Sequence, residues 1–126
     1  MQGHFDTANR PKVSLTIQSV DSGQTVEKLA LFDTGQDVAL SLPVIDLVRL
    51  GATLATTGIS EFGNGQRAAV LYFKVRVVID GEKRDVLAAM IENPEADEAI
   101  AGVALFKEYK VSIDFASRTI DFEKRT

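Results

Sequence analysis

Alternation of polar and apolar residues dominates the chain and predicts a protein built mostly of β-strands. Residues 12–18 read Lys-Val-Ser-Leu-Thr-Ile-Gln, in which every second residue is apolar, as in a strand with one buried face. Residues 25–32 form a second extended run that ends in Leu-Phe. The turn-forming residues Asp21, Ser22 and Gly23 lie between the two runs, so the pair is predicted to form a hairpin.

Two longer extended runs, residues 53–62 and 68–80, flank the sequence Gly63-Asn64-Gly65-Gln66. Asn and Gly both tolerate positive φ, so Asn-Gly between extended runs is a strong hairpin signal. Further strands are predicted at residues 85–91, 111–115 and 120–122, the last two joined by a turn at 116–118. The second half of the chain is therefore also predicted to be a series of hairpins.

Helix is limited to two short segments. Residues 44–50 follow Pro43 and stop before Gly51, which matches the preference for proline at a helix start and glycine after its end. A second short helix is predicted at 103–109. With 126 residues the chain is long enough for one domain, and its many short hairpins favour a small closed β-barrel. The polar residues 1–10 are expected to be a flexible N-terminal segment.

Composition narrows the possible functions. The hydrophobic content of 45% and charged content of 25% are ordinary for a globular protein. No apolar run approaches the ~20 residues that span a bilayer, and residues 1–12 lack an apolar signal core, so a cytoplasmic location without a membrane partner is expected. The net charge is −4, and basic residues form only isolated pairs, such as Lys83-Arg84 and Lys124-Arg125. A nucleic-acid partner is therefore not expected.

The residue inventory leaves carboxylates as the groups able to do chemistry. The chain has no cysteine, which excludes thiol nucleophiles and Cys-ligated metals, and its one histidine, His4, lies in the polar N-terminal segment. A metal site needs several ligands, so no metal and no cofactor are expected. The acidic residues of 92–98 do not have the spacing of an EF-hand loop and are interpreted as a solvated loop.

The most informative motif is Asp33-Thr34-Gly35, which directly follows the apolar residues Leu31 and Phe32. Asp33 supplies a carboxylate that can act as an acid or a base. Thr34 supplies a hydroxyl that can bond to backbone or to a partner loop, and Gly35 allows a tight turn with close backbone approach. The tripeptide alone is weakly specific, since Asp and Gly are common in turns.

The motif gains specificity from the ordered features around it. An extended stretch ending in Leu42-Pro43 follows it, then the helix at 44–50, and much later the segment Ile100-Ala101-Gly102 before a second short helix. In this order and spacing, from about Arg10 to Phe122, the chain resembles the retropepsin-like aspartic proteases, specifically their small single-domain prokaryotic members. The resemblance implies one protease domain over residues 1–126, with a mostly-β fold, a single small closed barrel and one or two short helices.

The resemblance also implies an activity. Peptide hydrolysis by carboxylates needs two of them sharing a proton, and this chain has one Asp-Thr-Gly, so the resemblance implies a homodimer that pairs two Asp33 carboxylates to activate water. Thr34 would reach across to the partner loop, and Gly35 would let the two loops approach closely. The implied substrate is a peptide or protein, with Asp33, Thr34 and Gly35 as the catalytic residues.

The hairpin around Phe62, Gly63, Asn64 and Gly65 lies where the family has its flap, a mobile cover that contacts substrate. The alternative is an ordinary surface hairpin, because Asn-Gly specifies a hairpin but not its role.

Three residues depart from the family pattern. Gln36 stands where active members often carry a small residue, and its longer side chain would crowd the site or contact substrate. Val103 stands where retroviral members have arginine, and Ala104 where many members have Asp or Asn. Two alternatives therefore stay open beside the enzyme: a protein-binding module that keeps the protease fold without turnover, and a structural dimer in which Asp33 only caps a turn.

Overall fold

The computed structural model describes residues 1–61 and 63–125, and within them the chain is mostly β, as the alternation predicts. The helical segments are α1 (Val44–Leu50) and the 3-10 helix η1 (Val103–Phe106). The strands are β1 (His4–Phe5), β2 (Pro11–Ser19), β3 (Thr25–Phe32), β4 (Leu40–Pro43), β5 (Thr53–Glu61), β6 (Arg67–Ile79), β7 (Glu82–Ile91), β8 (Ile100–Ala101), β9 (Tyr109–Asp114) and β10 (Thr119–Lys124).

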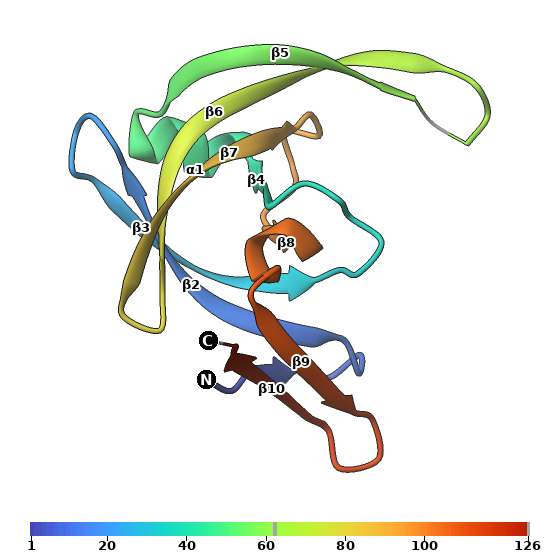
Figure 1. Ribbon diagram of the computed structural model, residues 1–126. Helices are drawn as coiled ribbons and strands as arrows, with labels where there is room; N and C mark the ends of the chain where they lie inside the picture. Colours follow the sequence, from blue (N-terminus) through green and yellow to red (C-terminus); the bar gives the residue numbers. More distant parts are fainter. Residues whose placement is uncertain (62, 126) are drawn as a thin grey trace.

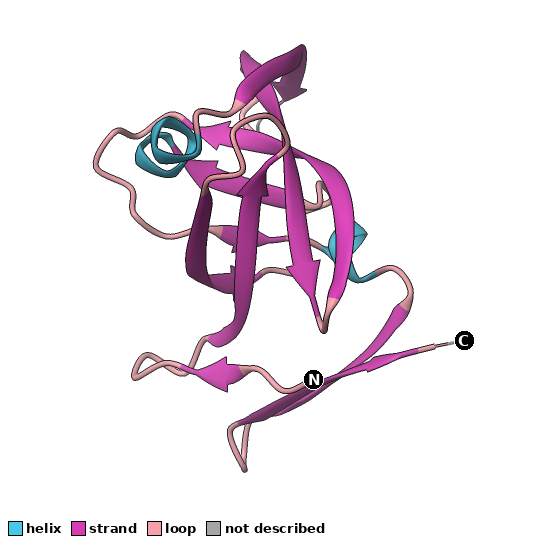
Figure 2. Cartoon of the chain, turned by 90° about the vertical axis from the view of Figure 1, so that its left-hand side faces the viewer, coloured by secondary structure: helices cyan, strands magenta, loops and turns pink. Residues whose placement is uncertain are grey.

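Six strands close into a barrel, which confirms the predicted fold class (Figures 1 and 2). The ring runs β2, β3, β8, β4, β7 and β6, and it closes where β6 pairs with β2, with Ile17 opposite Val77. Most neighbouring strands are antiparallel, but β8 runs parallel to β3 and β4 runs parallel to β7. The two-residue strand β8 is thus inserted between β3 and β4, next to the end of β3.

The hairpins follow the predicted turn chemistry. The predicted pairing of the first two long strands is confirmed by the β2–β3 ladder, in which Lys12 lies opposite Leu31. Between β6 and β7, Asp80 and Gly81 have φ of 52° and 81°. Positive φ at both central residues is what a two-residue type I′ hairpin turn requires. The long β5–β6 hairpin arches over the barrel and extends beyond it (Figure 1).

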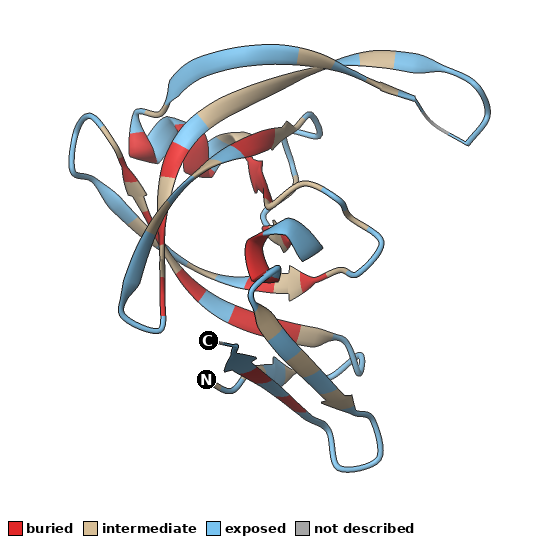
Figure 3. Ribbon diagram, viewed as in Figure 1, coloured by how far each residue is buried: buried red, intermediate tan, exposed pale blue. Residues whose placement is uncertain are grey.

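The buried core comes from the inward faces of the alternating strands (Figure 3). An aromatic cluster forms part of this core: the ring of Phe32 packs at 5.5 Å, centroid to centroid, against both Phe106 and Phe122. The rings of Phe106 and Phe122 are 4.6 Å apart. Because Phe32 is the residue before Asp33, this cluster anchors the point where β3 leaves the barrel.

Helix α1 lies where the sequence predicts it, from Val44 to Leu50, and Gly51 ends it in the left-handed region at φ 60°. Its inner face buries Leu47 and Leu50 together with the carboxylate of Asp46. Lys28 on β3 compensates that buried charge, with its Nζ 3.0 Å from Asp46 Oδ2.

The second helix is shorter than predicted. The sequence indicates a helix over 103–109, but the structure has one 3-10 turn, Val103–Phe106, and β9 begins at Tyr109. Tyr109 starts the alternation that continues through Val111 and Ile113, and it pairs with Lys124 of β10. The prediction was wrong at this boundary because strand pairing with β10 overrides a weak helical pattern.

Several backbone hydrogen bonds join residues 1–10 to the rest of the chain. The amino group of Met1 donates to the Phe122 carbonyl at 3.0 Å, and Gly3 N–H donates to the Ile120 carbonyl at 2.9 Å. Strand β1 then pairs with the start of β2. Backbone pairing of this kind leaves no mark in a polar sequence pattern, so flexibility at residues 1–10 stays a prediction that these contacts argue against.

Candidate functional site

Asp33 begins the turn that leaves β3, and backbone hydrogen bonds fix its position. Its N–H donates to the Ala101 carbonyl on β8 at 3.0 Å, and its own carbonyl accepts from Gln36 N–H at 3.2 Å. Its side-chain Oδ1 accepts from the Gly35 N–H at 2.8 Å. The side chain is half-buried, so the turn holds one carboxylate oxygen in a fixed direction while part of the group stays accessible.

Thr34 and Gly35 complete the turn and are both exposed. The Thr34 hydroxyl makes no hydrogen bond to another residue within the described part of the chain, so it is available to a group outside this chain. At Gly35 an added Cβ would lie 3.2 Å from Asp33 Oδ1. A larger residue there would therefore press on the carboxylate that the turn positions.

Gln36 braces this loop from within. Its Nε2 donates to the Ile100 carbonyl at 3.3 Å, and its Oε1 accepts from the Ser41 hydroxyl at 2.9 Å. A longer contact of 3.4 Å joins the same Nε2 to the Val38 carbonyl. The long side chain thus lies along its own loop and ties β8 to β4, a role that the sequence did not indicate.

Gly102 also shapes this loop, through backbone hydrogen bonds and through the space left by its missing side chain. Its N–H donates to the Ala39 carbonyl at 2.9 Å, and the next residue, Val103, donates to the Gln36 carbonyl at 3.0 Å. A Cβ on Gly102 would lie only 1.8 Å from the Val38 carbonyl oxygen. Two segments nearly 70 residues apart therefore cross here at a distance that only glycine allows.

A pocket of about 340 Å³ lies between this loop and the β5–β6 hairpin. The loop contributes Asp37 and Val38, and the hairpin contributes Ser60, Val70 and Tyr72. A second pocket of about 250 Å³ shares Ser60 and Val70 with the first. The two pockets form a groove along the underside of the hairpin, and the groove is of a size to receive side chains of an extended peptide.

The proposed flap residues occupy the hairpin's turn, apart from Phe62, which lies outside the described residues. Gly63, Asn64 and Gly65 join β5 to β6, with φ 81° at Gly65 and Gln66 N–H donating to Asn64 Oδ1 at 3.0 Å. The structure brings the strands of the hairpin, not this turn, into the pocket beside the loop.

Sequence reasoning missed the pocket residues Ser60, Val70 and Tyr72. Their signal is weak but readable: they lie at alternate positions of the two predicted strands, and so on one face of the hairpin.

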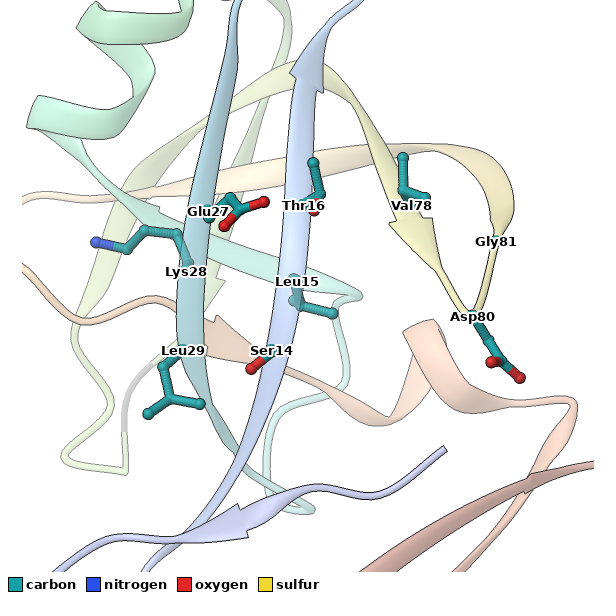
Figure 4. A pocket seen from close by; sticks show the side chains of 9 residues that line it. All are labelled: Ser14, Leu15, Thr16, Glu27, Lys28, Leu29, Val78, Asp80 and Gly81. Carbon is teal, nitrogen blue, oxygen red and sulfur yellow. The ribbon is translucent and has the colours of Figure 1, made fainter.

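Other features of the surface lie apart from Asp33. A pocket of about 430 Å³ on the outside of β2 and β3 is lined by Glu27, Lys28 and the Asp80–Gly81 turn, and by no residue of the Asp33 loop (Figure 4). Within residues 1–61 and 63–125, no three or more His, Asp and Glu side chains cluster to hold a metal ion. None of the described helices has the length and apolar character needed to cross a bilayer.

Comparison with solved structures identifies the fold. A retropepsin-like aspartic protease from Rickettsia conorii superposes with a TM-score of 0.66 at 16% identity, over 97% of this chain and 88% of that one. This chain has the retropepsin-like fold. EIAV protease complexed with the inhibitor HBY-793 gives a TM-score of 0.49 at 21% identity, over 82% of this chain and 90% of that one. No family model matches the sequence, and no curated protein matches it.

Within the retropepsin-like fold, the structure brings together residues that the sequence keeps apart. Asp33 and Gln36 from the first third of the chain meet Ala101 and Gly102 from its last third. The crossing explains why the later apolar segment ends in glycine, since a Cβ at Gly102 would meet the carbonyls of Gln36 and Val38.

Proposed function

We propose that this chain is an aspartic endopeptidase, with residues 1–126 as one protease domain, which hydrolyses peptide bonds as a homodimer. One observation carries the proposal: a half-buried carboxylate, Asp33, is held at an exposed turn of a retropepsin-like fold. The turn continues directly into the loop that forms one wall of a groove of side-chain size. The fold's aspartic protease neighbour supports a hydrolase.

The chemistry requires a second carboxylate, which the partner subunit's Asp33 would supply across a two-fold axis. Two carboxyl groups within hydrogen-bonding contact share one proton, because repulsion between two negative charges keeps both from ionising at once. The ionised Asp33 takes a proton from water, whose oxygen bonds to the peptide carbonyl carbon, while the protonated one donates to the carbonyl oxygen. Transfer of a proton to the amide nitrogen then lets the C–N bond break, giving a free carboxyl and a free amine.

The surface around the turn is compatible with such a partner. Thr34 and Gly35 are exposed, and the apolar side chain of Val103, hydrogen-bonded through its backbone to Gln36, is 38% exposed beside them. A partner that brings its own Asp33 to this point would cover these residues. The hydroxyl of Thr34 would then find its acceptor on the partner loop.

The hairpin is proposed to act as a flap. Phe62, Gly63, Asn64 and Gly65 would close over a bound peptide, exclude water and add backbone hydrogen bonds. The groove beneath the hairpin supports this assignment, because a peptide lying in it would be covered by the strands that carry the turn.

A second candidate function rests on the contact between Gly35 N–H and Asp33 Oδ1. Such a contact caps a turn whether or not the residue is catalytic. It is equally compatible with a non-catalytic module, either protein-binding or structural, in which the fold and the dimer remain but Asp33 serves only the turn.

Replacement of Asp33 by Asn separates the two candidates. Asn keeps an acceptor for Gly35 N–H but loses the titrating carboxyl, so peptide cleavage should fall by at least about 10³-fold while the fold and the dimer persist. Initial rates on a mixed peptide library, read by mass spectrometry, measure this.

Asp114→Asn is the matched control. Asp114 caps its own turn in the same way, with Oδ1 accepting from Ala116 N–H at 3.0 Å, but it lies on β9 away from the groove. The control should cleave like the unaltered protein. Cleavage retained by purified Asp33→Asn protein refutes the catalytic assignment, and absence of cleavage by the unaltered protein favours the non-catalytic module.

A further inference from the structure

The pocket beside the Asp33 loop has a distinctive set of polar groups. Gln36 and Ser41 line it, but their side chains are hydrogen-bonded to each other. The remaining polar groups are the exposed carboxylate of Asp37 and the hydroxyls of Ser60 and Tyr72. None of these three side chains has a hydrogen bond or an ion pair with another described residue. Asp37 is therefore a charged acceptor in the pocket whose carboxylate has no hydrogen-bond partner among the described residues.

The rest of the lining suits the stem of a long side chain. Val38, Val70 and Ala89 give the pocket apolar walls, and no lysine or arginine lines it. The adjoining pocket repeats this pattern, with Met90 as an apolar wall and Glu92 as its only charged residue. The groove beneath the hairpin is thus lined by acidic groups and apolar surface, without a basic residue.

The absence of a side chain at Gly58, on the neighbouring strand β5, makes room for the ring of Tyr72. A Cβ on Gly58 would lie 2.9 Å from Tyr72 Cε2, so the ring occupies the space that a side chain at position 58 would fill. The ring is therefore packed against β5 rather than free to swing through the pocket. An aromatic ring and a carboxylate that line one pocket are a combination that favours a cationic guest.

Resting on the proposed peptidase function, we infer that this pocket is a substrate subsite for a lysine or arginine side chain. The apolar stem lies against Val38 and Val70, and the cationic end pairs with Asp37. Because Asp37 is exposed, the pair is screened by water and salt, so the preference over an uncharged side chain of similar length is about two- to fivefold.

Paired peptides test this inference. A peptide that the protein cleaves is made in versions that carry lysine, or its uncharged counterpart norleucine, at each position near the scissile bond. At one position the lysine peptide should have a kcat/KM about two- to fivefold above its norleucine partner. Asp37→Asn should bring that ratio to about one, and 0.5 M NaCl should lower it. Asp121→Asn, a change to an exposed carboxylate on β10, should leave the ratio unaltered.

Two results overturn the inference: no position at which lysine is favoured, or a preference that survives Asp37→Asn. Either result leaves cleavage itself intact, so the proposed function stands or falls separately. If the unaltered protein cleaves nothing, the proposed function fails. The inference is then decided by the binding of paired extended peptides, labelled with a fluorophore and carrying lysine or norleucine at the same position, to the Asp33→Asn protein, read by fluorescence anisotropy. Equal binding, or no binding, of the two peptides then overturns it.

Discussion

Gly102 shows how one missing side chain shapes the candidate site. Its φ of −97° is open to any residue, so its importance lies in space and not in backbone conformation. The carbonyls of Gln36 and Val38 lie where a Cβ would be. Those carbonyls belong to the loop that begins at Asp33, so the shape of that loop depends on the absence of an atom almost 70 residues away.

We predict that Gly102→Ala destabilises the protein by about 3 kcal/mol or more, because backbone and not a flexible side chain must move. Thermal or urea unfolding measures the change. Gly63→Ala is the control: a Cβ there meets nothing within 4 Å, so its effect should stay within about 0.5 kcal/mol. Equal stability of the two variants would contradict the crossing described here.

The residues of the candidate site also show which roles could be predicted from the sequence and which could not. Asp33 could be singled out because a carboxylate, a hydroxyl and a glycine follow a predicted strand directly. Gln36 and Tyr72 could not, because each owes its role to partners distant in sequence: Ile100 for Gln36, and Gly58 across the β5–β6 ladder for Tyr72. A sequence pattern indicates which face of a strand a residue occupies, but not which atoms it contacts there.

Among the elements, the β5–β6 hairpin has the clearest functional interpretation. Among the described strands β5 pairs with β6 alone and forms the end of the sheet, and every residue of Thr53–Glu61 is exposed or half-buried. Little packing therefore holds the outer part of the hairpin in place. Such a segment can open at low cost, which is the property that a cover over the groove needs.

We predict that amides at residues 63–66 exchange rapidly in the free protein and slow markedly, by about tenfold or more, when a peptide inhibitor binds. The turn at Asp80–Gly81, which follows the other end of β6, serves as an internal control and should exchange alike in both states. Hydrogen exchange followed by mass spectrometry measures both. Unchanged exchange at 63–66 in the complex argues for an ordinary surface hairpin.

Strands were predictable here and helix ends were less so, for a physical reason. Alternation is a property of each strand by itself, so β2, β3 and β6 could be located to within a residue or two. The end of η1 depends instead on Tyr109 pairing with Lys124, a contact that the local sequence does not display. The order β3, β8, β4 was likewise invisible, because β8 has only two residues.

At the scale of the whole molecule, the proposed dimer predicts that the surface around Asp33 is the interface between the two subunits. Val103→Asp places a charge on the apolar surface beside the turn, so it should weaken the dimer at least about tenfold. Val48→Asp is the control: Val48 is 69% exposed on α1, and its change should leave the dimer intact. Sedimentation measures both. A fully active monomer in the unaltered protein would exclude the shared site.

An ion-pair network joins the acidic loop at 92–98 to the start of the barrel. Arg10 donates to both carboxylate oxygens of Glu98 at 3.1 and 3.0 Å, and Lys12 also bonds to it. Partial burial tends to raise the pKa of Glu98, but the hydrogen bonds from Lys12 and Arg10 outweigh it and hold the pKa below its ordinary value of 4.5. The segment anchored in this way leads directly into β8.

Because the folded pKa is the lower one, the stabilisation is complete above pH 4.5 and is lost as the pH falls through the folded value. Glu98→Gln should therefore lower stability by about 1 kcal/mol at pH 7, and its difference from the unaltered protein should shrink as the pH approaches 3. Thermal melts across this range measure it, with Glu123→Gln, an exposed carboxylate on β10, as control. A difference independent of pH would contradict the network's role.

The insertion of β8 between β3 and β4 has a consequence for how the protein is made. Asp33 leaves the ribosome long before Ala101 and Gly102, whose backbone groups fix its turn. The loop that begins at Asp33 therefore cannot take its final shape while the first two thirds of the chain are being synthesised, and closing so long a loop is slow. A protein whose proposed activity is to cut polypeptides would thus leave the carboxylate of Asp33 unpositioned until Ala101 has been synthesised.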